Sequence, residues 1–126
     1  MRLLLDTVTF IWSVTSPDRL SRAASSALQN PSALREISVI SLSEIAIKRA
    51  LGKLTFSKED LAQGLAELQL RVLPYTAEHA HVFFDLPRHH GDPSDRQIIA
   101  QALAEGIPVV TADEAFRLYK GLKIIW

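Results

Sequence analysis

Short apolar runs alternate with longer segments of helical pattern, and this alternation limits the possible folds more than any other feature of the chain. The apolar runs are a few residues long and mostly lack polar alternation, which is typical of strands covered by helices on both faces. Strands separated by helices favour parallel pairing, because a parallel pair needs a long crossover connection. We therefore expect an α/β protein with a central parallel sheet of about five strands flanked by helices. The expected strands are Leu3–Leu5, Ile37–Ile40, Val72–Leu73, Val109–Val110 and Ile124–Trp126.

Several helix boundaries are marked by capping residues. Ser57-Lys-Glu-Asp60 resembles a capping box, and Asp92-Pro93 places a capping acid before a proline suited to the first helical position. Glycines after apolar segments indicate helix ends. The expected helices run from near Thr7, from Leu42 to Leu51 before Gly52, from Ser57 to about Leu70, from Thr76 through Phe84 to Leu86, from Asp92 to Glu105 before Gly106, and over the short segment Glu114–Leu118.

Composition indicates one ordinary globular domain over residues 1–126. Nearly half of the 126 residues are apolar, and the formal net charge is zero, so overall charge does not indicate nucleic-acid binding. Cysteine is absent, which excludes disulfides and thiolate metal sites. No apolar stretch approaches the roughly 20 residues that a membrane span requires, and the segment from Arg2 to Asp6 is too short for a signal peptide. We expect a cytoplasmic protein without membrane contact.

Four acidic residues stand where expected elements begin or end: Asp6, Glu44, Asp95 and Asp113. Ligands of open parallel sheets bind beyond the carboxyl ends of the strands, where such side chains can converge. Converging carboxylates repel by several kcal/mol unless a cation lies between them, since charges ~4 Å apart still interact strongly in a protein site. The pattern therefore predicts a site for a divalent cation, Mg²⁺ or Mn²⁺.

Each acid also has a structural interpretation. Asp6 and Asp113 can cap the helices that follow them, and Glu44 stands four residues before Lys48, as in an exposed ion pair. Asp95 favours function, because the residues three, four and seven positions later are apolar and place its carboxylate on the buried helix face. Asp92 is expected to act as a structural cap outside the metal ligands.

Two threonines and the histidines complete the candidate residues. Thr7 and Thr111 each stand beside an acid and can either hold a carboxylate or water or satisfy the turn backbone. The histidines lack an HExxH pattern and cysteine partners, so zinc is a weak hypothesis, and His89 and His90 are interpreted as loop residues. Trp12 and Trp126 favour core or interface packing.

Four ordered blocks resemble the PIN-domain proteins, and more narrowly the VapC-type toxins of bacterial toxin–antitoxin pairs. The resemblance extends over essentially the whole chain, and only the blocks together make it specific. They are Leu3-Leu-Leu-Asp-Thr7 through Trp12, Ser43-Glu-Ile-Ala-Ile-Lys48, His90-Gly-Asp-Pro-Ser-Asp-Arg96 with Ile99-Ala-Gln-Ala102, and Val110-Thr-Ala-Asp113 with Phe116. The departures are Val8, Ser43 and Ser94, where relatives often have His, Trp and Phe, and none removes a carboxylate.

The resemblance implies a PIN-like three-layer sandwich and a Mg²⁺- or Mn²⁺-dependent endoribonuclease. Its acidic quartet would be Asp6, Glu44, Asp95 and Asp113. The three aspartates would bind metal directly, and Glu44 would act through water or orient the nucleophile. Lys48 and Arg96 are candidates for RNA phosphate contacts. The resemblance also implies 5′-phosphate products, a small cognate antitoxin protein and a homodimer.

One alternative function and several details stay open at this point. The alternative is a catalytically weak PIN-fold binding or regulatory module, whose sequence sign would be a missing quartet acid. A haloacid-dehalogenase-like phosphatase fits poorly, because it needs an acid where Val8 stands, and the order of acids does not fit a receiver domain. The RNA target, whether transfer, ribosomal or messenger, and the number of metal ions are not indicated.

Overall fold

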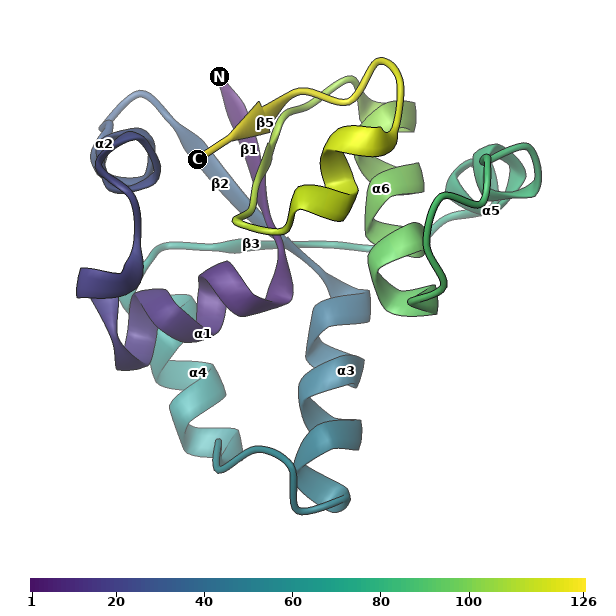
Figure 1. Ribbon diagram of the computed structural model, residues 1–126. Helices are drawn as coiled ribbons and strands as arrows, with labels where there is room; N and C mark the ends of the chain where they lie inside the picture. The colour runs from purple at the N-terminus through teal and green to yellow at the C-terminus, as the bar shows by residue number, and fades with distance from the viewer.

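A five-stranded, fully parallel sheet forms the centre of the protein, which a computed structural model describes over residues 1–126 (Figure 1). The strand order is β3-β2-β1-β4-β5, so β1 lies in the middle. The expected α/β fold with a five-stranded parallel sheet is confirmed. The strands are β1 (Arg2–Leu5), β2 (Leu34–Ser38), β3 (Arg71–Leu73), β4 (Val109–Val110) and β5 (Ile124–Ile125).

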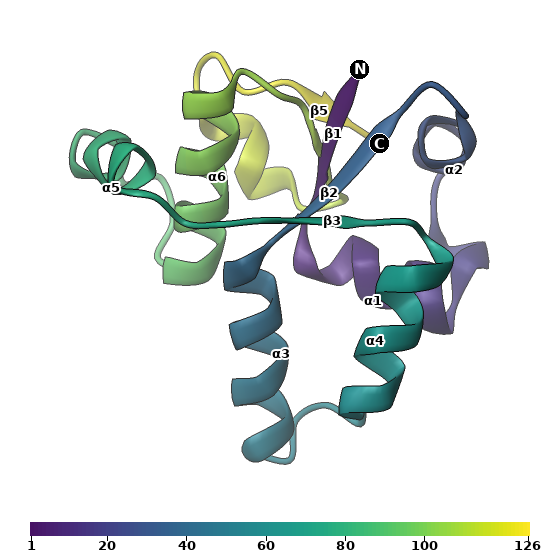
Figure 2. The same ribbon diagram turned by 180° about the vertical axis from the view of Figure 1, so that it is seen from behind.

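Six α-helices and two short 3-10 helices connect the strands and cover both faces of the sheet. In Figures 1 and 2, α1, α2, α3 and α4 gather on one side, and α5 and α6 on the other. None of the helices combines the length and apolar character needed to cross a lipid bilayer. The helices are α1 (Thr7–Thr15), η1 (Pro17–Arg19), α2 (Arg22–Gln29), α3 (Val39–Ala50), α4 (Lys58–Glu67), α5 (Ala77–Phe84), α6 (Pro93–Glu105) and η2 (Glu114–Leu118).

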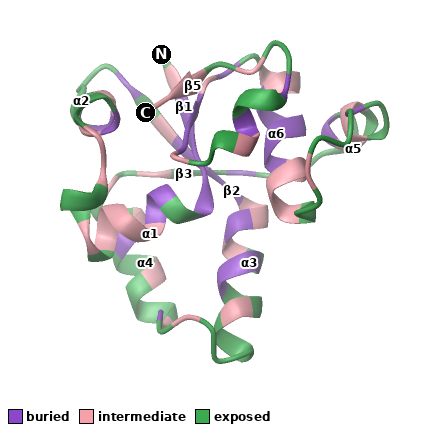
Figure 3. Cartoon of the chain, viewed as in Figure 1, coloured by how far each residue is buried: buried purple, intermediate pink, exposed green.

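The sheet separates two apolar cores, as expected for a three-layer arrangement. Alternate residues of β1 point to opposite faces: Leu3 and Leu5 join one core, and Leu4 joins the other. The first core contains Phe10 of α1 and side chains of α2, α3 and α4, while the second contains Ile98 and Ile99 of α6. Figure 3 shows the buried β1 and α6 segments at the centre of the molecule.

The order in which strands are added to the sheet reverses at β1. β2 and β3 lie on one side of it, whereas β4 and β5 lie on the other. Such a switch point leaves a crevice beyond the carboxyl ends of the two adjacent strands, here β1 and β4. Asp6 directly follows β1, and Thr111 directly follows β4.

The expected strand Ile37–Ile40 is wrong in its boundaries. The observed β2 runs from Leu34 to Ser38, and Val39 and Ile40 already belong to α3. The helix starts early because the Ser38 hydroxyl accepts a hydrogen bond from the Ile40 N–H and caps it. The strand also extends backwards through two charged residues whose charges are compensated: the Arg35 guanidinium donates to main-chain carbonyls, and Glu36 pairs with Arg2.

Other boundaries agree more closely, with two differences. The capping box at Ser57 is present, but α4 ends at Glu67 rather than near Leu70, and Gln69 then adopts a positive φ of 51°. Helix α2 was not expected at all, although Ser21 caps it by accepting from the Ala24 N–H. The Asp92 cap, Pro93 at the helix start and Gly106 in the left-handed conformation at its end are confirmed.

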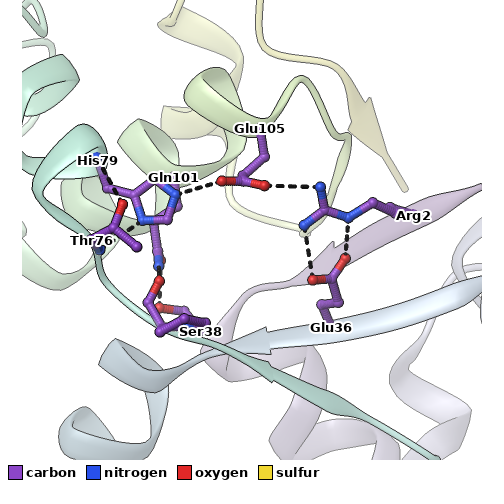
Figure 4. Close-up of polar contacts among 8 residues, drawn as sticks. Arg2, Glu36, Ser38, Thr76, His79, Gln101 and Glu105 are labelled. Carbon is purple, nitrogen blue, oxygen red and sulfur yellow. Dashed lines mark hydrogen bonds and ion pairs between the residues drawn. The ribbon is translucent and has the colours of Figure 1, made fainter.

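A polar network joins the start of β1 and the middle of β2 to α5 and α6 (Figure 4). Arg2 donates to both oxygens of Glu36, at 2.6 and 2.9 Å, and to Glu105 at 2.9 Å. The other Glu105 oxygen lies 2.8 Å from Nε2 of His79, whose Nδ1 accepts from the Thr76 N–H at 3.1 Å. The network is an electrostatic connection between the sheet and the two helices, and it lies outside the acidic cleft described below.

Candidate active site

A cleft of about 300 Å³ contains all four acids of the expected quartet. Asp6 follows β1 and caps α1, Glu44 lies in the second turn of α3, Asp95 in the first turn of α6, and Asp113 caps η2. These segments are distant in sequence and meet because the sheet brings their ends together. The lining residues are Asp6, Thr7, Val8, Trp12, Glu44, Lys48, Asp92, Asp95, Ala112 and Asp113.

Asp6 is the most buried of these acids, with 4% of its surface exposed. One carboxylate oxygen accepts from the Thr111 hydroxyl at 2.6 Å, and the other accepts from the Thr9 N–H at 2.9 Å. Burial raises the pKa of Asp6 and nearby Asp113 adds to this, while the bonds from Thr111 and Thr9 oppose it. The Thr111 hydroxyl also accepts from the Asp113 N–H at 3.0 Å, so one threonine is hydrogen-bonded to both Asp6 and Asp113.

Glu44 differs from the aspartates because its charge is compensated. Its Oε1 accepts from the Thr7 hydroxyl at 2.7 Å, and its Oε2 lies 2.8 Å from Nζ of Lys48. The hydrogen bond to Glu44 is the main cause of the raised pKa of Lys48. The ion pair four residues apart therefore exists, but it faces the cleft rather than open solvent.

Asp95 lies in an environment that opposes its ionisation. Burial, followed by the charges of Asp92, Glu44, Asp113 and Asp6, raises the pKa of Asp95 to about 7. No Lys or Arg pairs with its carboxylate, and its side-chain partner is His90, whose Nε2 lies 3.4 Å away. The cleft thus holds more negative charge than its own side chains neutralise.

The donor set suits a hard cation that keeps part of its water shell. Mg²⁺ usually binds protein through one or two carboxylates and retains several waters, and Mn²⁺ shares its preference for oxygen ligands. No group of three or more acidic or histidine side chains is arranged as a ready-made metal cage. The carboxylates of Asp6, Asp95 and Asp113 consequently fit a partly hydrated ion, and direct binding by all three stays a prediction.

The remaining candidates occupy different positions. Thr7, Asp92 and Lys48 line the cleft, and Thr111 contacts Asp6 just behind it. The Arg96 guanidinium instead donates to the carbonyl of Pro87 at 2.8 Å and lies 5.3 Å from the Phe83 ring, so it is not part of the lining. Its phosphate contact stays a prediction, with these bonds as competitors.

Two aromatic residues near the cleft, Trp12 and Tyr119, are not among the site residues expected from the sequence. Trp12 lines the cleft and contacts both Trp126, at 6.0 Å between ring centroids, and Arg19, whose guanidinium lies 4.1 Å over its ring. Tyr119 was not considered, although its hydroxyl lies 2.8 Å from Nδ1 of His90. The sequence signal for this contact is weak, because Tyr119 is separated from His90 by 29 residues.

Comparisons with known proteins agree on one family. The PIN domain family model matches residues 3–122. "Ribonuclease VapC22" of Mycobacterium tuberculosis is 33% identical over 121 residues, which is 94% of this chain and 92% of that protein. The chain therefore has a curated relative that it spans almost completely.

Solved structures share the fold at lower identity. DNA-bound VapBC from Salmonella typhimurium matches with a TM-score of 0.71 and 24% identity, over 98% of this chain and 96% of that one. VapBC-5 from Mycobacterium tuberculosis, a member of the VapBC family of toxin-antitoxin systems, matches with a TM-score of 0.63 and 21% identity, over 98% and 97%. With a family model matching nearly its whole length, the chain belongs to the PIN-domain family.

Proposed function

We propose that the protein is a Mg²⁺- or Mn²⁺-dependent endoribonuclease that acts as the toxin of a toxin–antitoxin pair. The observation that carries this proposal is the cleft in which Asp6, Glu44, Asp95 and Asp113 meet. A fold kept only as a binding module has no need to hold four carboxylates together at an electrostatic cost. The ribonuclease name of the VapC22 relative supports RNA as the substrate class.

Each residue of the cleft would have its own role in phosphodiester hydrolysis. Asp6, Asp95 and Asp113 would hold the cation through carboxylate oxygens, and Thr111 keeps the Asp6 carboxylate in place. The cation, when bound, supplies Lewis acidity that activates water and stabilises charge at phosphorus and the leaving oxygen.

Glu44 and Lys48 supply the remaining functions. Glu44, fixed by Thr7, would orient the attacking water. Lys48 pairs with Glu44 and presents further N–H donors at the cleft wall, where an RNA phosphate would lie. Hydrolysis would leave a 5′-phosphate and a 3′-hydroxyl.

A cognate antitoxin and a second copy of the chain are the proposed protein partners. The excess of carboxylates in the cleft would attract a basic side chain from an antitoxin segment, which would compete with the cation. The VapBC complexes of similar fold support pairing with such an antitoxin. Homodimer formation follows from the family resemblance, and a cytoplasmic location follows from an RNA substrate.

Cleavage of total cellular RNA tests the function directly. Purified protein free of antitoxin is incubated with the RNA and Mn²⁺, and new 5′ ends are mapped by sequencing. We expect discrete cuts with 5′-phosphate ends that disappear with EDTA and in Asp6→Asn. The positions of the cuts would also show whether transfer, ribosomal or messenger RNA is the substrate.

Asp18→Asn is the matched control, because it makes the same chemical change at an exposed residue of η1, outside the cleft. It should cut as the wild type does. Cuts of equal yield in Asp6→Asn and wild type would contradict the proposal and indicate a contaminating nuclease. Absence of cutting by the wild type on all three RNA classes would favour the binding-module alternative.

A further inference from the structure

His90 lies between the acidic cleft and a buried tyrosine, in the loop that joins α5 to α6. Its Nε2 lies 3.4 Å from Oδ2 of Asp95, and its Nδ1 lies 2.8 Å from the Tyr119 hydroxyl. Tyr119 is 2% exposed, and the His90 side chain is 17% exposed. The imidazole packs edge-on against the Tyr119 ring, with centroids 5.5 Å apart. Both nitrogens of a largely buried ring therefore have a defined partner.

The loop that carries His90 is held in place by Arg96. The Arg96 guanidinium donates to the carbonyl of Pro87 at 2.8 Å and, at a longer 3.4 Å, to that of Leu86. It also donates to the Tyr119 hydroxyl oxygen at 3.3 Å. Arg96, Tyr119, His90 and Asp95 thus form one chain of contacts that ends at a carboxylate of the cleft.

The direction of each hydrogen bond in this chain follows from the chemistry of its two ends. A guanidinium only donates, so the Tyr119 oxygen accepts from Arg96 and keeps its own proton free to donate. When Asp95 is ionised its carboxylate only accepts, so the His90 nitrogen facing it must then donate. The two requirements agree: the Tyr119 O–H donates to Nδ1, and Nε2 carries the imidazole proton.

We propose that His90 is a positioning residue for Asp95, with its tautomer set by Tyr119. The inference rests on the proposed function, in which Asp95 is a cation ligand. A single hydrogen bond to one oxygen fixes the rotation of the carboxylate and leaves its other oxygen for the cation. Groups behind metal ligands commonly act in this way, and losing one typically costs about 10–100-fold in metal affinity.

Two amide substitutions of His90 separate positioning from general structural support. In His90→Gln the amide nitrogen reaches about as far as Nε2, so a donor toward Asp95 is kept. In His90→Asn the shorter side chain places its amide near Nδ1, which keeps a partner for Tyr119 but loses the bond to Asp95. Both substitutions remove the ring, so a purely structural role predicts similar losses in both.

The affinity for Mn²⁺, measured calorimetrically without RNA, is the main readout. We expect His90→Asn to bind Mn²⁺ about 10–100-fold more weakly than wild type and His90→Gln to bind within about threefold of it. Tyr119→Phe should lose several-fold, because Nδ1 then has no hydroxyl to set its tautomer. Equal affinity in wild type and His90→Asn, or equal loss in both amide variants, would overturn the proposal.

The tautomer of His90 gives a second readout that requires neither metal nor activity. Long-range ¹H–¹⁵N NMR spectra of the metal-free protein at about pH 8, where an ordinary imidazole is neutral, distinguish protonated from unprotonated ring nitrogens. The His90 signals, assigned by their absence in His90→Gln, should show protonated Nε2 and bare Nδ1, and a mixture of tautomers in Tyr119→Phe. A protonated Nδ1 in wild type would overturn the proposal even if His90→Asn failed to fold.

The same experiments separate failure of this inference from failure of the proposed function. Asp95→Asn should abolish high-affinity Mn²⁺ binding if the cleft is a metal site. A wild type that does not bind Mn²⁺ would overturn the metal-dependent function and with it the role of His90 at that metal. Normal binding in the wild type that depends on Asp95 but not on His90 would overturn the positioning role alone.

Discussion

Ionisation of Asp95 costs free energy in the folded protein when no cation is bound. Its carboxylate is half-buried and lies near other acids, and the resulting pKa of about 7 lies well above the ordinary value of 3.8. An acid whose folded pKa is raised binds more protons in the folded state than in the unfolded state. The contribution of Asp95 to the stability of the metal-free protein therefore falls as pH rises from about 4 to about 7.

Asp95→Asn should remove much of this pH dependence. Each pKa unit corresponds to about 1.4 kcal/mol, so the metal-free variant should be more stable than wild type by about 2–4 kcal/mol above pH 7 and nearly equal to it near pH 4. Denaturant unfolding in EDTA at several pH values measures the difference. Asp18→Asn, at an exposed position, should track the wild type throughout. A constant difference between Asp95→Asn and wild type across this pH range would contradict the raised pKa.

Three of the four acids in the cleft could be placed from the sequence because they stand at element boundaries that the pattern reveals, whereas Glu44, expected at a boundary too, lies in the second turn of α3. Asp6 and Asp113 follow apolar runs too short to be anything but strands, and Asp95 follows a proline and a capping acid. His90 and Tyr119 could not be paired in this way. Their contact depends on how the loop before α6 packs on the segment after η2, which no local spacing encodes.

At the scale of elements, strand limits were predictable only where apolar residues define them. β2 contains the charged residues Arg35 and Glu36. Two adjacent charges in a sequence suggest a loop, and only their long-range partners explain why they lie in a strand. Val39 and Ile40 read as strand, because Ser38 gives no sign in sequence of being a helix cap rather than a strand residue. Helix α2 is short and contains few large apolar residues. Its buried residues, Ala24 and Leu28, have the four-residue spacing of a helix, but two positions are too few to predict one.

Glu105 connects α6 both to β1 and to α5, and removing its charge should loosen all three. Arg2 and His79 bind its two oxygens, and His79 and then Arg2 lower its pKa (Figure 4). In Glu105→Gln, the amide N–H of the new side chain would face one of the two donors, Arg2 or His79, and that hydrogen bond would be lost. We expect a loss of about 1–2 kcal/mol in the free energy of unfolding at neutral pH, toward the low end for a disrupted hydrogen bond because the side chain is 25% exposed.

The pH dependence and a control variant test the cause of this loss. An acid with a lowered pKa stabilises the fold above its unfolded pKa and ceases to do so as pH falls through the folded value, so the difference should shrink on acidification. Glu114→Gln makes the same change at a side chain that is 86% exposed and lies 3.6 Å from Arg117. It should cost less than about 0.5 kcal/mol. Equal costs in the two variants would show that the network does not couple the elements.

On the scale of the whole molecule, the sheet gathers like charges that the rest of the fold must stabilise. β1 and β4 lie side by side at the switch point, so their following acids are brought together by backbone pairing rather than by attraction. The two apolar cores on either side of β1 supply the stability that this arrangement requires. The formal net charge of zero means that the excess of acid in the cleft is balanced elsewhere on the surface. RNA would consequently need a cation in the cleft to approach it closely.

Cation binding should therefore be visible as stability of the entire domain. A ligand that binds only the folded state at 100 times its dissociation constant stabilises it by about 2.7 kcal/mol, which shifts the melting temperature of a domain of this size by several degrees. We expect Mn²⁺ to raise the melting temperature of wild type and of Asp18→Asn, and EDTA to reverse the shift. The shift should be absent in Asp6→Asn and Asp95→Asn. It should also shrink in wild type below about pH 6, because protons compete with the cation for carboxylates whose pKa values are raised. An equal shift in all four proteins would place the bound cation outside this cleft.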